Sequence, residues 1–296
     1  MPNLGEEVTK NPMARLRSRG LAAVLLLASL LLAGCGSRPQ ADPNDPLAGT
    51  ITASGSTALL PLASLAAEIF MEQHLNVTVN VSGGGSYNGL QQVASGAVDI
   101  GNSDIPAAGE LAAALVEHRV AIAPFVIIVH PDNPVDGLSL EQLARILTGE
   151  ITNWREVGGP DLEVMVVSRP QSSGSRATIV EKVLGGEGDI TPQALVQDSN
   201  GKVLTTVQYT PGAIGYIDAS YYRPSKVKAL ALGGVAYSQD AVEAGQWPIW
   251  TYEYMYTKGE PAGLVRAFLD FVLSGEFQEE YVRELGFVPI TQEIAR

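Results

Sequence analysis

Residues 49–104 read GTITASGSTALLPLASLAAEIFMEQHLNVTVNVSGGGSYNGLQQVASGAVDIGNSD, and this stretch decides the fold class. Short β-prone runs alternate in it with apolar, helix-prone runs, giving predicted strands at 50–52, 77–81 and 98–100 and helices at about 58–73 and 87–94. Strands that alternate with helices are typical of an α/β fold with a mainly parallel sheet. The carboxyl ends of such strands meet at one edge of the sheet, where ligands bind.

Two further β-prone runs are predicted to cross between two lobes. Residues 120–129 are nearly all apolar and long for one strand, and residues 249–256 are aromatic and β-prone. Two crossings make one lobe discontinuous, so we expect lobe I at 49–124 plus 250–296 and lobe II at 125–249, each a mainly parallel sheet flanked by helices. The length of 296 residues agrees with this division, because a single compact core rarely grows so large.

The N-terminal part has the features of a secretion signal. Three arginines between Met13 and Gly20 precede the apolar residues 21–32, and the string Leu-Ala-Gly-Cys then ends at Cys35. This order is typical of a signal peptide, and the apolar run is too short for a membrane span. The last string resembles the lipobox of bacterial lipoproteins. We therefore expect residues 1–34 to be removed, acyl chains such as palmitate on Cys35, and a proline-rich tether at 35–48.

Three helix starts rich in hydroxyl groups and glycine form the candidate binding site. Each follows a β-prone run, and the three strings are Gly55-Ser56-Thr57-Ala58, Gly83-Gly84-Gly85-Ser86 and Arg169-Pro170-Gln171-Ser172-Ser173-Gly174-Ser175. A single such start is most often only a helix cap. Three that share one sheet edge indicate an anion site, because backbone N–H groups and helix dipoles attract anions and hydroxyls add neutral donors. None of them is a P-loop, because no Gly-Lys-Ser/Thr follows at the required spacing.

Asp104 ends a fourth polar run and allows two interpretations. In the first, it caps a helix near residues 107–117. In the second, it lies at the mouth of the anion site, where a carboxylate repels an anion unless that anion carries a proton. Hydrogen phosphate has a proton to donate and sulfate has none, so Asp104 would select phosphate by rejecting sulfate.

Together these motifs resemble the phosphate-binding proteins of bacterial phosphate ABC transporters, a family of the two-lobed type II periplasmic binding proteins. The resemblance covers nearly all of residues 50–290 and includes Thr148–Trp154, Pro211–Tyr216 and Gly286–Ile290. It implies a monomeric, extracytoplasmic solute-binding lipoprotein that captures inorganic phosphate between its lobes and delivers it to an ABC permease. It also implies that the lipid anchor is the one attachment to the cell membrane, and that there is no catalysis, cofactor or metal.

The resemblance further implies which residues contact phosphate, namely Ser56, Thr57, the Ala58 N–H, Ser86, Asp104, Arg169, Ser173, Gly174 and Ser175. In this set Asp104 takes the proton of the ligand and Arg169 supplies the cationic contact. Two departures from the family pattern are expected to change affinity rather than ligand class. Gln171 stands where the family often has an acid that pairs with the arginine, and Ser172 would be strained if its loop required a positive φ.

Composition and motif content limit the other functions. A net charge of −13 without a basic cluster disfavours a nucleic-acid partner, and one cysteine excludes an internal disulfide. The three histidines lack metal-ligand spacing, and Tyr221 and Tyr222 are interpreted as packing residues. A binder of another tetrahedral oxyanion, such as sulfate or molybdate, stays open, as does a phosphate-sensing lipoprotein. A secreted phosphate-ester hydrolase would need a nucleophile or metal cluster that the sequence does not display.

Overall fold

The protein is described by a computed structural model that covers residues 45–291 and 294. Strands and helices alternate along the first part of the chain, which contains β1 (Gly49–Gly55), α2 (Leu60–Gln73), β2 (Val77–Gly83), α3 (Ser86–Ser95), β3 (Ile100–Ser103), α4 (Glu110–Ala114) and β4 (Leu115–Val129). The middle part contains β5 (Gly137–Leu138), α5 (Leu140–Thr148), the 3-10 helix η1 (Trp154–Val157), β6 (Met165–Ser168), α6 (Gly174–Leu184), β7 (Leu195–Val196), α7 (Asn200–Tyr209) and β8 (Ala213–Asp218).

The last part begins with η2 (Ala219–Tyr221), a 3-10 helix, and continues with β9 (Lys228–Ala229), β10 (Ala231–Leu232), α8 (Gln239–Glu243), β11 (Trp250–Lys258), α9 (Gly263–Val272), α10 (Gly275–Phe277) and the π-helix η3 (Gln278–Val282). The three strands and two helices predicted within residues 49–104 are all present, with β3 starting at Ile100 rather than at Val98. The predicted α/β class is thereby confirmed.

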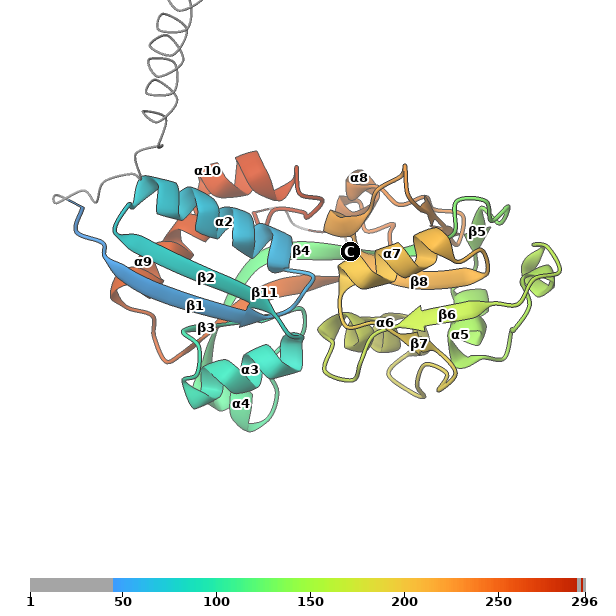
Figure 1. Ribbon diagram of the computed structural model, residues 1–296, viewed down its shortest axis with the longest axis horizontal. Helices are drawn as coiled ribbons and strands as arrows, with labels where there is room; N and C mark the ends of the chain where they lie inside the picture. Colours follow the sequence, from blue (N-terminus) through green and yellow to red (C-terminus); the bar gives the residue numbers. More distant parts are fainter. Residues whose placement is uncertain (1–44, 292–293, 295–296) are drawn as a thin grey trace, which may run out of the picture. The chain divides into compact units, whose positions relative to one another are not determined.

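One sheet has the spatial order β2-β1-β3-β11-β4-β8-β6-β7, and β9 also pairs with β4 (Figure 1). We call β1, β2 and β3 the first strand set, and β6, β7 and β8 the second. Pairs within each set are parallel, whereas β11 and β4 run antiparallel to their neighbours. The carboxyl ends of the parallel strands therefore carry the loops that were predicted to bind the ligand.

The strand β4 belongs to both parts of this sheet. Residues 115–124 pair with β11, and residues 125–129 pair with β8. Every residue from Val120 to Val129 is buried, which explains why the run is apolar without alternation. The residue before β11 joins the same junction, because Phe125 N donates to Ile249 O at 2.9 Å. The two β-prone runs singled out in the sequence thus meet where the two strand sets join.

Helices cover the first strand set on both faces (Figure 1). Buried residues of α2 and α9, such as Leu62 and Phe268, pack with Ile51 in the large core cluster. On the other face, Leu90 and Val93 of α3 pack with the tyrosines of β11 in a smaller cluster. The sheet is therefore buried on both faces at β3, whereas alternate residues of the outer strand β2 stay exposed.

The helix expected near residues 107–117 is much shorter than predicted. The helix α4 spans only Glu110–Ala114, and its N-cap is Gly109 without any side-chain cap, so the interpretation of Asp104 as a helix cap is wrong. The strand β4 already starts at Leu115, which pairs with Lys258 of β11. Strand pairing with a distant segment therefore overrides the local helix preference of this stretch.

Residues 1–34, Cys35 and most of the predicted tether lie outside the described residues. The described part of the tether contacts the folded body through Asp45, whose carboxylate pairs with His74 at 3.0 Å. Within residues 45–291 and 294, no helix has the length and apolar character needed to cross a membrane.

Candidate functional site

Ser56 organises the first loop, between β1 and α2. Its backbone N–H donates to Asn102 O at 2.8 Å, and its hydroxyl oxygen accepts from Ala58 N and Leu59 N at 3.0 and 3.1 Å. Ser56 thus bonds two backbone donors of the turn before α2, whereas the N-cap residue of α2 itself, Leu59, has no side-chain cap. The roles of Ser56 and the Ala58 N–H as phosphate donors stay predictions, since both groups bond to each other here. The next residue, Thr57, has a side chain that is 6 % exposed and lies against the second strand set.

The second loop, Gly83 to Ser86, approaches the third loop closely. Gly85 has φ +94°, and a Cβ there would lie 2.6 Å from Ser172 O, so only glycine fits. Next to it, Tyr87 N donates to Ser172 O at 3.2 Å. Described non-glycine residues all have negative φ, so Ser172 does not carry the strain that a positive φ would cause. The second and third loops therefore meet, although 86 positions separate Ser172 from Ser86 in the chain.

Asp104 lies where these two loops meet and is 1 % exposed. Its Oδ1 accepts from the Ser86 hydroxyl, and its Oδ2 accepts from the Ser175 hydroxyl at 2.8 Å. Ser86 starts α3 and Ser175 lies in the first turn of α6, so one carboxylate joins helix starts from both strand sets. Each carboxylate oxygen has a second acceptor site, which leaves capacity to accept a proton from a ligand.

The third loop approaches Asp104 through Gly174. A Cβ at Gly174 would collide with Asp104 Oδ1 and with the Ser86 hydroxyl, so this position also needs glycine. Ser173 caps α6 by accepting from Arg176 N at 3.3 Å, as predicted from its place before the helix. Gln171, which stands where the family often has an acid, donates to Asp189 at 3.1 Å, and Asp189 pairs with Arg176 rather than with Arg169.

Arg169 is the cation of this site, and its residue is 2 % exposed. Its Nη2 donates to Thr57 Oγ1 and to Asp198 O, both at 3.0 Å, and its Nε and Nη1 have no partner. Burial lowers the pKa of Arg169, and the charge of Asp104 opposes that change. An arginine stays charged in proteins even so. The site therefore contains a buried positive charge with N–H groups still able to donate.

Two residues at the site did not emerge from the sequence as binding candidates. Asn200, the first residue of α7, is fully buried and donates from Nδ2 to Thr57 Oγ1 at 3.2 Å. Tyr221 donates from its hydroxyl to Thr57 O at 2.9 Å, so its interpretation as a packing residue is incomplete. The string Asp198-Ser199-Asn200-Gly201 also starts a helix after a strand, but that strand, Leu195-Val196, has only two residues and gives a weaker signal than the strands before the three selected loops.

Two buried carboxyls lie on the strands behind the site. Burial, together with the charge of Asp104, raises the pKa of Asp218 to about 8 and raises the pKa of Glu253 well above its usual value. Both oxygens of Glu253 and one of Asp218 lack hydrogen-bond partners, as does the amide of Asn102. With a pKa of about 8, the Asp218 carboxyl keeps its proton near pH 7 and adds little negative charge there.

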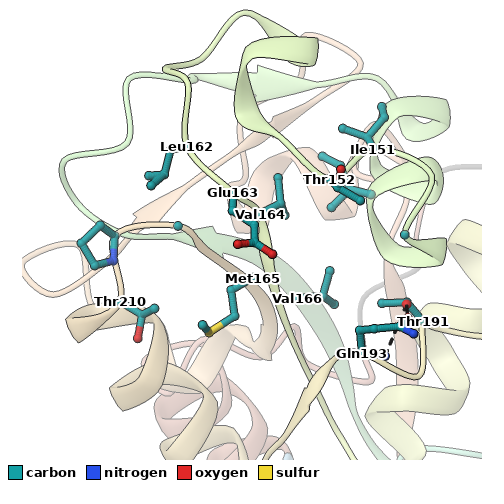
Figure 2. A pocket seen from close by; sticks show the side chains of 14 residues that line it. Ile151, Thr152, Leu162, Glu163, Val164, Met165, Val166, Thr191, Gln193 and Thr210 are labelled. Carbon is teal, nitrogen blue, oxygen red and sulfur yellow. Dashed lines mark hydrogen bonds between the residues drawn. The ribbon is translucent and has the colours of Figure 1, made fainter.

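A separate hollow of about 650 Å³ is lined by residues that all belong to 146–212 (Figure 2). Figure 2 shows Glu163 and Met165 running between Ile151 on one side and Thr210 on the other. The hollow lies at the amino end of β6, opposite the edge that carries Arg169. Its lining is mostly apolar and lacks a cation, so it offers an inorganic anion little stabilisation.

Comparison with known proteins places these features in one family. The PBP superfamily domain matches residues 40–276 as a family model. The phosphate-binding protein PstS of Bacillus subtilis is 40 % identical over 289 residues, which cover 93 % of this chain and 96 % of that protein. A Clostridium perfringens protein solved with bound phosphate has a TM-score of 0.77 and 31 % identity, covering 82 % of this chain and all of that one. A phosphate transport receptor from Vibrio cholerae has a TM-score of 0.67 and 29 % identity, covering 80 % and 99 % of the two chains.

These matches extend over both strand sets, β4 and β11, and include the loops that meet at Asp104 and Arg169. The chain therefore belongs to the PBP superfamily, in the family of the phosphate-binding protein PstS.

Proposed function

We propose that this protein captures inorganic phosphate between two lobes and delivers it to the permease of an ABC transporter. The observation that carries the proposal is the buried guanidinium of Arg169, whose Nε and Nη1 nitrogens have no protein partner. A buried donor without a partner is costly, and an anion would satisfy both groups at once. The similar proteins from Bacillus subtilis, Clostridium perfringens and Vibrio cholerae are all named for phosphate, which supports the same ligand.

Asp104 favours phosphate over sulfate. Its carboxylate can accept the proton of hydrogen phosphate, whereas a sulfate oxygen would face a carboxylate oxygen with no proton between them. The hydroxyls of Ser86 and Ser175 already donate to Asp104, so they have to rotate before they can donate to phosphate. The proposed phosphate contacts are therefore those implied by the resemblance. On binding, the hydroxyls of Ser86 and Ser175 would stop donating to the Asp104 carboxylate and donate to phosphate instead.

The two lobes are proposed at 49–124 plus 250–296 and at 125–249. The contacts of Thr57 with Arg169, Asn200 and Tyr221, and that of Asp104 with Ser175, all cross this boundary. Opening of the lobes would break these contacts and expose the site to solvent, which is the hinge closure that traps ligands in two-lobed binding proteins.

The remaining features of the proposal depend on the N-terminal sequence and on the family. We propose that the chain is a monomeric lipoprotein with acyl chains on Cys35, anchored outside the cytoplasm to the cell membrane. Residues 36–48 would then let the folded body reach the permease. Phosphate sensing is the alternative use of the same binding event. A strain that lacks this protein would then lose phosphate signalling and keep phosphate uptake.

Calorimetry of the purified chain with phosphate and with sulfate tests the ligand. Micromolar binding requires about −8 kcal/mol, and charge-assisted hydrogen bonds contribute roughly 1.5 to 3 kcal/mol each, so about eight such bonds suffice after the entropy of binding is subtracted. We expect phosphate to bind and sulfate to bind at least about 100-fold more weakly, a difference of about 3 kcal/mol. Equal affinity for the two anions, or no heat with phosphate, contradicts the proposal.

Two further measurements sharpen this test. Arg169→Met should abolish detectable phosphate binding, whereas the control Arg119→Met removes the same charge from a side chain that is 51 % exposed and should leave affinity unchanged within about twofold. Incubation with a generic phosphate ester should release no phosphate. Sustained release would favour the hydrolase alternative.

A further inference from the structure

The hydroxyl oxygen of Thr57 accepts two hydrogen bonds. One comes from Arg169 Nη2 at 3.0 Å and the other from Asn200 Nδ2 at 3.2 Å. A hydroxyl has two acceptor sites and one proton, so both acceptor sites of Thr57 are filled and only donation remains. The hydroxyl of Thr57 therefore has to act as a hydrogen-bond donor toward any additional partner.

The direction of the Asn200 bond follows from its own surroundings. Asn200 Oδ1 accepts from Asp218 N at 2.9 Å, which places the NH₂ group on the side of Thr57. The side chain is fully buried at the start of α7, so solvent cannot compete for either end of the amide. An amide with its oxygen held by a backbone N–H has a defined orientation, and here it can only donate to Thr57.

The side chain of Thr57 is fixed as well. Its methyl group packs against Gly83, where an added Cβ would lie 2.8 Å from Thr57 Cγ2, and its carbonyl accepts from the Tyr221 hydroxyl. A β-branched side chain with one methyl packed in this way has little freedom at χ1. The hydroxyl proton is thus the one part of Thr57 that is free to choose a partner.

We propose that Asn200 is a positioning residue for phosphate binding, which fills the second acceptor site of Thr57 and forces that hydroxyl to donate to the bound anion. This inference rests on the proposed function. Because Thr57 can no longer accept, the proton of hydrogen phosphate is left to Asp104. Asn200 and Arg169 come from 125–249 and Thr57 from 49–124, so the hydroxyl is aligned only when these two segments are together.

A double-mutant cycle measured by calorimetry with inorganic phosphate tests this inference on the full chain. Asn200→Ala should weaken phosphate binding about tenfold, the effect of one net hydrogen bond of about 1.4 kcal/mol. Thr57→Val, which keeps the shape and removes the hydroxyl, should weaken it at least as much. In the Thr57→Val background, Asn200→Ala should cost less than about twofold, because the hydroxyl through which it acts is gone.

Ser199→Ala is the matched control. Ser199 caps α7 through Lys202 N and does not touch Thr57, so its loss should lower thermal stability while phosphate affinity stays within about twofold of the wild type. Thr57→Ala provides a second cycle if Thr57→Val does not fold. A merely structural role of Asn200 predicts equal losses of affinity in both Thr57 backgrounds, and that result would overturn the inference.

The proposed function and this inference fail in different ways. If the wild-type chain binds no phosphate, the proposed function is wrong. If the wild type binds phosphate and the losses from Asn200→Ala and Thr57→Val add up, the ligand stands and the positioning role of Asn200 is wrong.

Discussion

Replacement of Asp218 by asparagine should change how the stability of the protein depends on pH. The carboxyl is fully buried, one of its oxygens accepts from Ser220 N and Oγ, and the other has no partner. Burial raises its pKa from 3.8 to about 8. Asparagine has the shape of the protonated carboxyl and does not titrate, so Asp218→Asn keeps the neutral form at every pH.

The magnitude follows from the shift. Between pH 4 and pH 8 the folded state keeps the proton of Asp218 and the unfolded state has lost it. Stability contributed by this group is therefore complete below pH 4 and is lost as the pH rises toward 8, at about 1.4 kcal/mol per pH unit. Relative to the wild type, Asp218→Asn should gain close to 3 kcal/mol in the free energy of unfolding between pH 5 and pH 7.

Guanidinium unfolding followed by tryptophan fluorescence at pH 5, 6 and 7 measures this difference. Ile217→Val, at the neighbouring buried position of β8, is the control, because it removes one methyl and should cost about 1 kcal/mol equally at each pH. If the difference between Asp218→Asn and the wild type is the same at pH 5 and pH 7, Asp218 is not protonated in the folded state and the reasoning is refuted.

Three further predictions concern the loops. Asp104→Asn should raise sulfate affinity and lower phosphate affinity, each about tenfold, because the amide donates where the carboxylate accepted; unchanged sulfate exclusion in calorimetry contradicts the proton-acceptor role. Gly174→Ala should weaken phosphate binding about 10- to 100-fold, since overpacking against Asp104 and Ser86 costs about 1 to 3 kcal/mol; calorimetry giving wild-type affinity would show that α6 can yield there. Ser56→Ala should lower the free energy of unfolding by about 1 kcal/mol in denaturant titrations without phosphate, and an unchanged value would show that this cap is dispensable.

Much of the site could be predicted because its signals are local. A hydroxyl residue or glycine after a β-prone run marks a helix start, and parallel strands bring such starts to one sheet edge. The contacts of Asp104 with Ser86 and Ser175 bring two of the three loops together, and the Thr57 bond to Arg169 joins the first loop to the third. The expectation of one shared edge holds only for the first two loops. The strands β3, β11, β4 and β8 are antiparallel in turn, so the second strand set runs opposite to the first and the third loop comes from the carboxyl end of that opposed set.

The missed residues depend on contacts that local patterns do not encode. Tyr221 contacts Thr57 across 164 positions of the chain. The sequence offers no sign of this contact, so the tyrosine was interpreted as a packing residue. Asn200 follows only a two-residue strand, β7, which is too short to produce a clear β-prone run. Residues 115–117 were expected to be helical from their local sequence. They form a strand instead, because they pair with residues of β11 that lie about 140 positions away, and local propensity contains no information about such partners.

An acidic protein can bind an anion if the buried groups of its site are in the right protonation states and donate hydrogen bonds in the right directions. The chain has a net charge of −13, but surface charges are screened beyond about 8 Å at physiological ionic strength, whereas buried groups are screened much less. Near pH 7 the raised pKa of about 8 keeps Asp218 neutral, and Asp104 and Asp198 act on Arg169 by raising its pKa against the effect of burial. With Thr57 limited to donation and Asp104 suited to acceptance, a tetrahedral anion fits best when it carries one proton. Selectivity for phosphate then follows from the direction of a few hydrogen bonds rather than from the charge of the whole protein.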